Sequence, residues 1–312
     1  MPTATLPVQG ISFVTDGGLE TDLIFHHGVD LPDFAAFPLL DTSAGRELLT
    51  GYYADYAAIA GRVGAGLLLE TPTWRASADW GLRLGYDAAD LDRLNTDAIT
   101  MLHGLRAQYG TAIDTVLVGG SVGPRGDGYS ADHQLTPADA AEYHRPQLQA
   151  FAAAGADLAT AYTLTHIGEA IGVVEAARSV GIAIAVSFTV ETDGRLPSGD
   201  TLGAAIAAVD QAAHPDHFLI NCAHPEHIRH ALAEPGSWRE RIAGIRVNAS
   251  VRSHAELDSA EELDEGDIAA LASSHRELTR ALPAVTIVGG CCGTDARHVA
   301  ALWGTDLPAA NS

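Results

Sequence analysis

Eight short apolar runs, each rich in Val, Ile or Leu, recur along the chain and most constrain what it can fold into. Each run is followed by small polar residues or glycine and then by an alanine-rich stretch of helical character. The runs cover residues 11–15, 66–71, 115–121, 157–163, 182–188, 218–222, 245–248 and 285–288. Continuous apolar strands that alternate with helices indicate a parallel sheet covered on both faces.

Eight such repeats in 312 residues predict a (β/α)8 TIM barrel, with residues 1–312 forming a single domain. The alternative is a Rossmann-like open sheet. However, Asp16-Gly17-Gly18 after the first run lacks the G-x-G-x-x-G spacing that a dinucleotide needs. The charged stretch 256–267, between the seventh and eighth runs, is expected to be a solvated insertion.

The carboxyl ends of the strands in a TIM barrel converge on one face, where the active site lies. The residues expected around this mouth are Asp16, Thr71, Ser121, Tyr162, Cys222, Asn248, Cys291 and Cys292. The sixth and eighth strands would therefore bring Cys222 close enough to the cysteine pair to share one ion.

All three cysteines of the chain lie at predicted strand ends, which favours a chemical use of the thiols. Zinc is bound by thiolates in tetrahedral geometry, and catalytic sites keep one position open for a ligand. Adjacent cysteines in a regular strand would point to opposite faces, but glycines on both sides of Cys291 and Cys292 allow both sulfurs to turn toward one point. The alternative is that the cysteines are small buried apolar residues.

A second possible ligand set includes histidine, since His224 and His227 follow Cys222 closely. Against this set, Pro225 and Glu226 are typical of the first turn of a helix. His227 and His230 would then lie along the surface of that helix. We expect the all-cysteine site.

Composition limits the partners of the chain. With 40 acidic and 18 basic residues the formal net charge is −22, which argues against a nucleic-acid partner and suits a cationic small substrate. The first residues have no secretory signal, and no apolar stretch reaches the ~18 residues of a membrane span. Three cysteines make a poor disulfide framework. We expect a cytoplasmic protein with reduced thiols and no membrane partner; its oligomeric state is unknown from the sequence.

Taken together, the motifs at the strand ends resemble those of the zinc-dependent homocysteine S-methyltransferases, a family with betaine-, S-methylmethionine- and cobalamin-coupled members. The matching motifs are Asp16-Gly17-Gly18, Gly120-Ser121-Val122-Gly123-Pro124, Asn221-Cys222 and Gly289-Gly290-Cys291-Cys292-Gly293. The resemblance covers almost the whole chain. It implies a (β/α)8 barrel with Zn2+ bound by Cys222, Cys291 and Cys292.

Three positions depart from the family pattern. The family's fourth strand usually ends in Glu-Thr, and that glutamate binds the homocysteine amino group, whereas this chain has Tyr162 there. The second strand is followed by Thr71-Pro72-Thr73-Trp74 in place of Thr-Asn-Thr. The tryptophan that many members have in the first loop is replaced by Phe34 or Phe37. The acceptor is therefore a thiol other than homocysteine, or another carboxylate pairs with its ammonium group, from Asp16, Glu20 or Glu70.

Several further residues are candidates for substrate binding. Asp16, next to Gly17, could hold a substrate amine or simply form the turn. Trp74, Tyr129 and Tyr162 could attract an onium donor by roughly 0.5–2 kcal/mol each, or pack at the rim. Elsewhere in the mouth, backbone amides around Gly120 and Gly123 could bind a carboxylate, and Asn248 could bind substrate or cap the next segment.

The leading hypothesis is a zinc-dependent S-methyltransferase that moves a methyl group from a small onium donor, of sulfonium or betaine type, to a thiol. The default acceptor is homocysteine and the product methionine. Three alternatives remain: the same chemistry on another thiol, a homocysteine-binding module that works with a separate corrinoid protein, and a barrel with a structural zinc ion.

Overall fold

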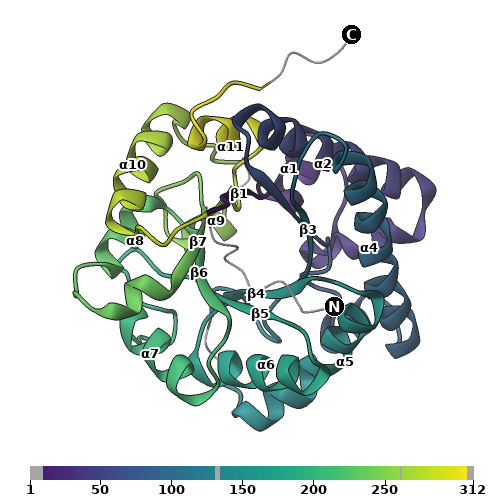
Figure 1. Ribbon diagram of the computed structural model, residues 1–312. Helices are drawn as coiled ribbons and strands as arrows, with labels where there is room; N and C mark the ends of the chain where they lie inside the picture. Colours follow the sequence, from purple (N-terminus) through teal and green to yellow (C-terminus); the bar gives the residue numbers. More distant parts are fainter. Residues whose placement is uncertain (1–9, 131–133, 261, 308–312) are drawn as a thin grey trace.

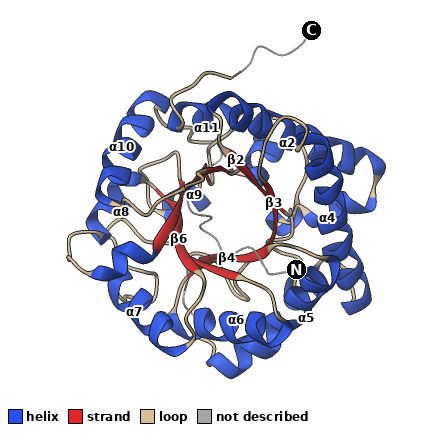
Figure 2. Ribbon diagram, in the orientation of Figure 1, coloured by secondary structure: helices blue, strands red, loops and turns tan. Residues whose placement is uncertain are grey.

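The computed structural model describes residues 10–130, 134–260 and 262–307, and its strands form a closed ring inside a ring of helices (Figures 1 and 2). The strands are β1 (Phe13–Val14), β2 (Gly66–Glu70), β3 (Val116–Val122), β4 (Leu158–Leu164), β5 (Ile184–Phe188), β6 (His217–Ala223), β7 (Ile242–Val247) and β8 (Ile287–Gly290). Every neighbouring pair is parallel, and β1 pairs with both β2 and β8, which closes the barrel. The predicted (β/α)8 TIM barrel is confirmed.

Helices connect successive strands on the outside of the barrel. The α-helices are α1 (Leu19–Phe25), α2 (Ser43–Val63), α3 (Ala78–Arg83), α4 (Ala88–Tyr109), α5 (Pro137–Ala154), α6 (Ile167–Val180), α7 (Leu202–Ala212), α8 (Pro225–Ala231), α9 (His254–Asp258), α10 (Ile268–Ala281) and α11 (Ala296–Leu302). The short 3-10 helices of the described residues are η1 (Pro32–Phe34), η2 (Phe37–Asp41) and η3 (Ser237–Arg241). In the described part of the chain, no helix is both long enough and apolar enough to cross a membrane.

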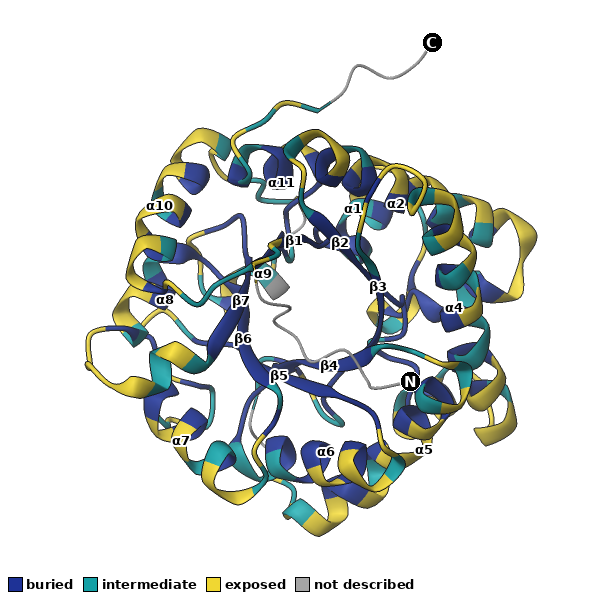
Figure 3. Ribbon diagram, viewed as in Figure 1, coloured by how far each residue is buried: buried dark blue, intermediate teal, exposed yellow. Residues whose placement is uncertain are grey.

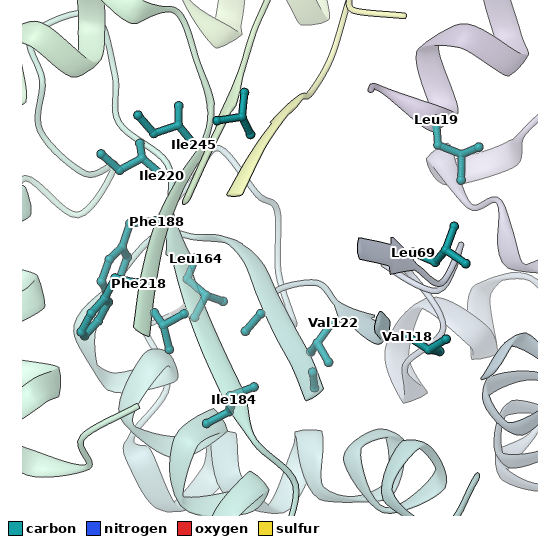
Figure 4. Packing of buried hydrophobic residues seen from close by; sticks show 14 of the residues in the cluster. Leu19, Leu69, Val118, Val122, Leu164, Ile184, Phe188, Phe218, Ile220 and Ile245 are labelled. Carbon is teal, nitrogen blue, oxygen red and sulfur yellow. The ribbon is translucent and has the colours of Figure 1, made fainter. Parts of the chain in front are cut away.

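Alternate residues of the strands form two apolar layers. Leu67 and Leu69 face the surrounding helices, whereas Leu68 belongs to a second cluster that fills the barrel. Figure 3 shows the strands buried and the outer helix faces exposed. In the outer layer the rings of Phe188 and Phe218 stack on neighbouring strands, with centroids 6.3 Å apart (Figure 4). The strands are therefore held from both sides.

Two expectations from the sequence need correction. β7 begins at Ile242 rather than at residue 245, because Gly244 is a strand residue here. A Cβ at Gly244 would lie 2.5 Å from Leu219 Cδ2, so the glycine reflects close packing of β6 and not a turn. The stretch 256–267 is also not simply solvated: Leu257, Leu263 and Asp264 line the central cavity.

Candidate active site

A cavity of about 530 Å³ opens at the carboxyl ends of the strands. The expected site residues that line it are Asp16, Gly17, Thr71, Ser121, Tyr162, Asn248, Cys291 and Cys292. Cys222 is fully buried beside this cavity and does not line it. The residues chosen from the sequence therefore lie around one chamber.

The three cysteines converge, with all their sulfur atoms within 4.8 Å of one another. Cys222 Sγ lies 3.5 Å from Cys292 Sγ. Cys222 sits near the end of β6 with a positive φ of 55°, at a register irregularity against β7. Such a backbone conformation is costly for a residue other than glycine and is often found at functional sites. Gly293, with φ 77°, turns the chain immediately after the cysteine pair.

This sulfur set fits a thiophilic metal ion. Sulfurs bound tetrahedrally at about 2.3 Å are about 3.8 Å apart, close to the spacing here. The Cys222 thiol donates to the neighbouring cysteine sulfurs, and these hydrogen bonds, together with burial, raise the pKa of Cys222 well above its ordinary value. Three thiols crowded in this way cannot all ionise unless a cation joins them. Because Cys291 and Cys292 are partly exposed in the cavity wall, a fourth ligand could arrive from the cavity.

A layer of polar side chains surrounds the sulfurs. Tyr129 Oη lies 3.0 Å from Cys222 Sγ and 3.6 Å from Cys292 Sγ. The Tyr129 ring stacks on His254, whose Nε2 lies 2.7 Å from the carbonyl oxygen of Cys222. Asn248 Oδ1 is 3.5 Å from Cys222 Sγ. These residues fix the sulfur-bearing loops to one another.

The histidine-containing ligand set is not assembled. His224 is the N-cap of α8, where its Nδ1 accepts a hydrogen bond from Glu226 N. His227 Nε2 lies 3.0 Å from the Val251 carbonyl oxygen, and His230 is exposed on the same helix. Within the described residues, neither histidine joins Cys222 in a group that could hold an ion.

A second buried cluster is organised by Arg246, a residue that the sequence analysis did not select. Its guanidinium contacts Asp16 Oδ1 at 2.7 Å and Glu70 Oε2 at 3.0 Å. It also donates to the carbonyl oxygens of Gly290 and Gly17, each at 2.9 Å. The signal available in the sequence was a charged residue within the seventh apolar run. Asp16 is therefore paired, and it is not a free turn former.

Tyr162, at the position where the resemblance implies a glutamate, belongs to this cluster. Its hydroxyl donates to Glu70 Oε2, and the Arg246 guanidinium lies over its ring at 4.9 Å. Burial raises the pKa of Glu70, although Arg246 and Tyr162 act in the opposite direction. Burial likewise raises the pKa of Asp16 against the effect of Arg246. Both carboxylates are thus ion-paired with Arg246, although Glu70 Oε1 has no hydrogen-bond partner in the described part of the chain.

The remaining acidic candidate, Glu20, has no such partner. It lies in the first turn of α1, lines the cavity and forms no ion pair with any described residue. Burial raises its pKa to about 7. Of Asp16, Glu20 and Glu70, Glu20 alone has no ion-pair partner among the described residues.

The other predicted residues have mixed surroundings. Thr71 Oγ1 accepts a hydrogen bond from Ser121 N at 2.9 Å and joins the end of β2 to β3. Of the two aromatic candidates in the first loop, Phe34 lines the cavity, whereas Phe37 is buried against Tyr86. The backbone at Gly18 lies so close to Cys291 that only glycine fits there, since a Cβ would be 2.5 Å from the Cys291 carbonyl oxygen.

Known proteins match the chain over nearly its full length. A family model described as homocysteine S-methyltransferase matches residues 13–304. The Escherichia coli (strain K12) protein named homocysteine S-methyltransferase is 28% identical, covering 96% of each chain. Homocysteine S-methyltransferase 4 of Zea mays is 26% identical, covering 93% of this chain and 87% of the relative.

Solved structures agree on the fold. The oxidized form of the homocysteine methyltransferase MmuM from Escherichia coli superposes with a TM-score of 0.74 at 24% identity, covering 96% of this chain and 97% of that one. The metallated form of MmuM gives a TM-score of 0.72 at 24% identity, covering 95% and 96%. With this barrel and the full-length family match, the chain belongs to the homocysteine S-methyltransferase family and is an S-methyltransferase enzyme.

Proposed function

We propose that the protein is a zinc-dependent methyltransferase that transfers a methyl group from a small onium donor to homocysteine, yielding methionine. The observation that carries this proposal is the convergence of the Cys222, Cys291 and Cys292 sulfurs at the cavity. Zinc held by these thiolates would supply the positive charge that keeps a substrate thiol deprotonated at neutral pH.

The methyl transfer needs no acid from the protein. The thiolate sulfur of the acceptor forms a bond to the methyl carbon while the bond from that carbon to the donor sulfur or nitrogen breaks. The electron pair of the broken bond stays on the donor atom, which leaves neutral. The residues of the cavity therefore have to hold the two substrates in line and exclude water, which is a large part of the rate.

Glu20 is the proposed partner of the homocysteine ammonium group. Asp16 and Glu70 already share Arg246, whereas Glu20 faces the cavity without a cation. A carboxylate that is costly to bury is stabilised when a substrate cation pairs with it. Glu20 thus takes the role of the glutamate that the family has in place of Tyr162.

Aromatic side chains are the proposed contacts of the onium donor. Tyr129 lies at the sulfurs with one ring face on His254, and it lines the cavity together with Trp74 and Phe34. The electron-rich faces of such rings suit a methylated cation. The donor itself is of sulfonium or betaine type in this proposal.

A different thiol acceptor is the second candidate, and Tyr162 is the observation that favours it. The Tyr162 hydroxyl is bonded to Glu70, so this position offers no carboxylate to an amino acid. A thiol without an amino group would then not need Glu20. Competition between homocysteine and 3-mercaptopropionate, which lacks the amine, separates the two candidates.

The direct test uses zinc-loaded protein with homocysteine and either S-methylmethionine or betaine, and detects methionine by mass spectrometry. Zinc K-edge spectroscopy should show the sulfur neighbours rising from three to four when homocysteine is added. An unchanged spectrum with no turnover would point to a structural ion. Turnover that appears only with a methylated corrinoid protein would support the partner-dependent alternative.

A further inference from the structure

Arg75 is a buried arginine in the cavity wall, on the segment that follows β2. The residue is only 7% exposed. The guanidinium carbon lies 4.0 Å from the ring centroid of Trp74 and 3.6 Å from that of Trp80. With aromatic rings on its faces, the guanidinium has its N–H groups left for contacts in its own plane.

Those N–H groups are poorly satisfied by the protein. Arg75 Nη1 donates to the Gly126 carbonyl oxygen at 3.1 Å, whereas Nε is buried with no acceptor. The indole nitrogens of Trp74 and Trp80 are also buried without an acceptor among the described residues. Three unsatisfied donors thus lie together in one wall of the cavity. A buried donor without a partner is destabilising, so such a group needs a functional explanation.

No described carboxylate forms an ion pair with Arg75, although Asp127, Glu20 and Asp33 are near enough to attract its charge. Asp33 is paired with Arg83, through Nε at 3.2 Å and a second contact. Asp127 accepts a hydrogen bond from Tyr129 N at 2.7 Å. Arg246 in the same cavity, by contrast, has two carboxylates within 3.0 Å. The positive charge of Arg75 is therefore available to a ligand, and a buried unpaired charge is one of the costlier features a fold can retain.

We propose that Arg75, which lies against the Trp80 ring, is the receptor for a substrate carboxylate. A planar guanidinium with free N–H groups matches the two oxygens of a carboxylate in its plane. This inference rests on the proposed function and deepens it: Glu20 binds a cationic group of the substrates and Arg75 an anionic one. The carboxylate comes from either the thiol acceptor or the methyl donor.

The site is first tested with butyrate, which has neither a thiol nor an onium group and so does not depend on methyl transfer. Butyrate is titrated into zinc-loaded protein while the indole N–H signals are followed by NMR. We expect saturable shifts of Trp74 and Trp80 but not of the distant Trp238 and Trp303 signals. Arg75→Gln should abolish the shifts, whereas Arg75→Lys should retain weakened binding.

The matched control is Arg83→Gln. Arg83 also lies over the Trp80 ring, at 4.8 Å, and lines the cavity, but it is paired with Asp33. We expect butyrate binding to change by less than about twofold in this variant, since its charge is already balanced. Far-UV circular dichroism and zinc content verify that each variant is folded.

The source of the carboxylate is identified by removing it chemically. Calorimetry compares homocysteine with 3-aminopropane-1-thiol, and S-methylmethionine with its decarboxylated sulfonium amine, on wild-type protein and Arg75→Gln. In the pair whose carboxylate binds Arg75, decarboxylation should weaken binding by about 10–100-fold in the wild type and by far less in the variant.

The outcomes are distinct. If decarboxylation of the thiol weakens binding much more in the wild type than in Arg75→Gln, the carboxylate belongs to the acceptor. If this difference is seen with the sulfonium compounds instead, the carboxylate belongs to the donor. Arg75-dependent butyrate shifts support the anion site even if no methyl transfer is ever detected. The proposal is overturned if butyrate leaves the Trp80 signal unchanged and both pairs lose equal affinity in wild type and Arg75→Gln.

Discussion

The cysteine cluster and the Arg246 cluster lie at the same mouth of the barrel, yet their charges are balanced in opposite ways. The sulfurs of Cys222, Cys291 and Cys292 share no protein cation at hydrogen-bonding distance among the described residues. Arg246, by contrast, has Asp16 and Glu70 as ion-pair partners and two carbonyl oxygens as acceptors. In the proposed function a ligand completes the first cluster, whereas the fold itself completes the second.

This difference assigns roles within one chamber. Polar groups that satisfy one another position strand ends, whereas buried groups that remain unsatisfied are those available to a metal or a substrate. Arg246 connects the ends of β1, β2, β7 and β8 and is expected to act on stability. The cysteines, Glu20 and Arg75 are expected to act on binding.

The largest difference between the two clusters is expected when one of the three sulfurs is removed. Cys291→Ser should reduce bound zinc from about one ion per chain to a trace and lower turnover by at least about a thousandfold, because zinc then lacks a thiolate ligand. Metal analysis and the methyl-transfer assay measure both. As a control, chelator-stripped wild-type protein should regain activity with added zinc, whereas the variant should not. A variant that retains stoichiometric zinc contradicts the assignment.

Replacing the central cation of the other cluster should chiefly change stability. Arg246→Met leaves two buried carboxylates without their partner, which should lower the free energy of unfolding by about 3–5 kcal/mol in urea titrations. Zinc content per folded chain should stay near that of wild type.

The control for this variant is Arg46→Met, which breaks the surface ion pair with Asp97 and should cost less than about 1 kcal/mol. If Arg246→Met and Arg46→Met lower the free energy of unfolding equally, the buried cluster does not stabilise the fold.

Glu20→Gln should affect binding without a large effect on stability. Loss of the charge should weaken homocysteine binding by about 10–100-fold, measured by calorimetry on zinc-loaded protein. Asp22 is a matched carboxylate on the same helix, but it contacts His26 and does not line the cavity. Asp22→Asn should change the affinity by less than about twofold. Unchanged binding in Glu20→Gln would leave the ammonium without its proposed partner.

The effect of Glu20 should also depend on pH. Burial raises the pKa of Glu20 to about 7, so the side chain is mostly neutral below pH 7 and mostly charged above it. An ammonium group needs the charged form. The ratio of homocysteine affinities, wild type over Glu20→Gln, should therefore be largest near pH 8.5 and fall toward one near pH 5.5. Using the ratio cancels the pH dependence of the thiol itself. A ratio that does not change with pH contradicts this role.

The strands and the sulfur site were predictable for a simple reason. Buried parallel strands leave long apolar runs, and the strand order fixes which run ends meet at the mouth. Cys222 and Cys291 could thus be placed together without coordinates. The start of β7 was missed because Gly244 is a turn former by itself and a strand residue only when packed on Leu219.

The charge pattern of the cavity could not be predicted from the sequence. Arg246 and Arg75 are both single arginines near strand ends, and nothing in the sequence tells which one finds carboxylates. Their difference arises from side chains that lie far apart along the chain, such as Asp16 and Glu70 for Arg246. For the same reason Glu20 could be named only as one of three carboxylates until the other two were seen to be paired.

The closure of the barrel between β1 and β8 has a consequence for how the enzyme is made. Val14 pairs with Val288, and Gly18 contacts the Cys291 carbonyl at a distance that no larger residue would allow. During synthesis, a nascent chain that has not yet emerged beyond residue 290 holds one of the three thiols. If the three thiols hold one zinc ion, as proposed, the metal site cannot be complete until the chain beyond β8 has emerged.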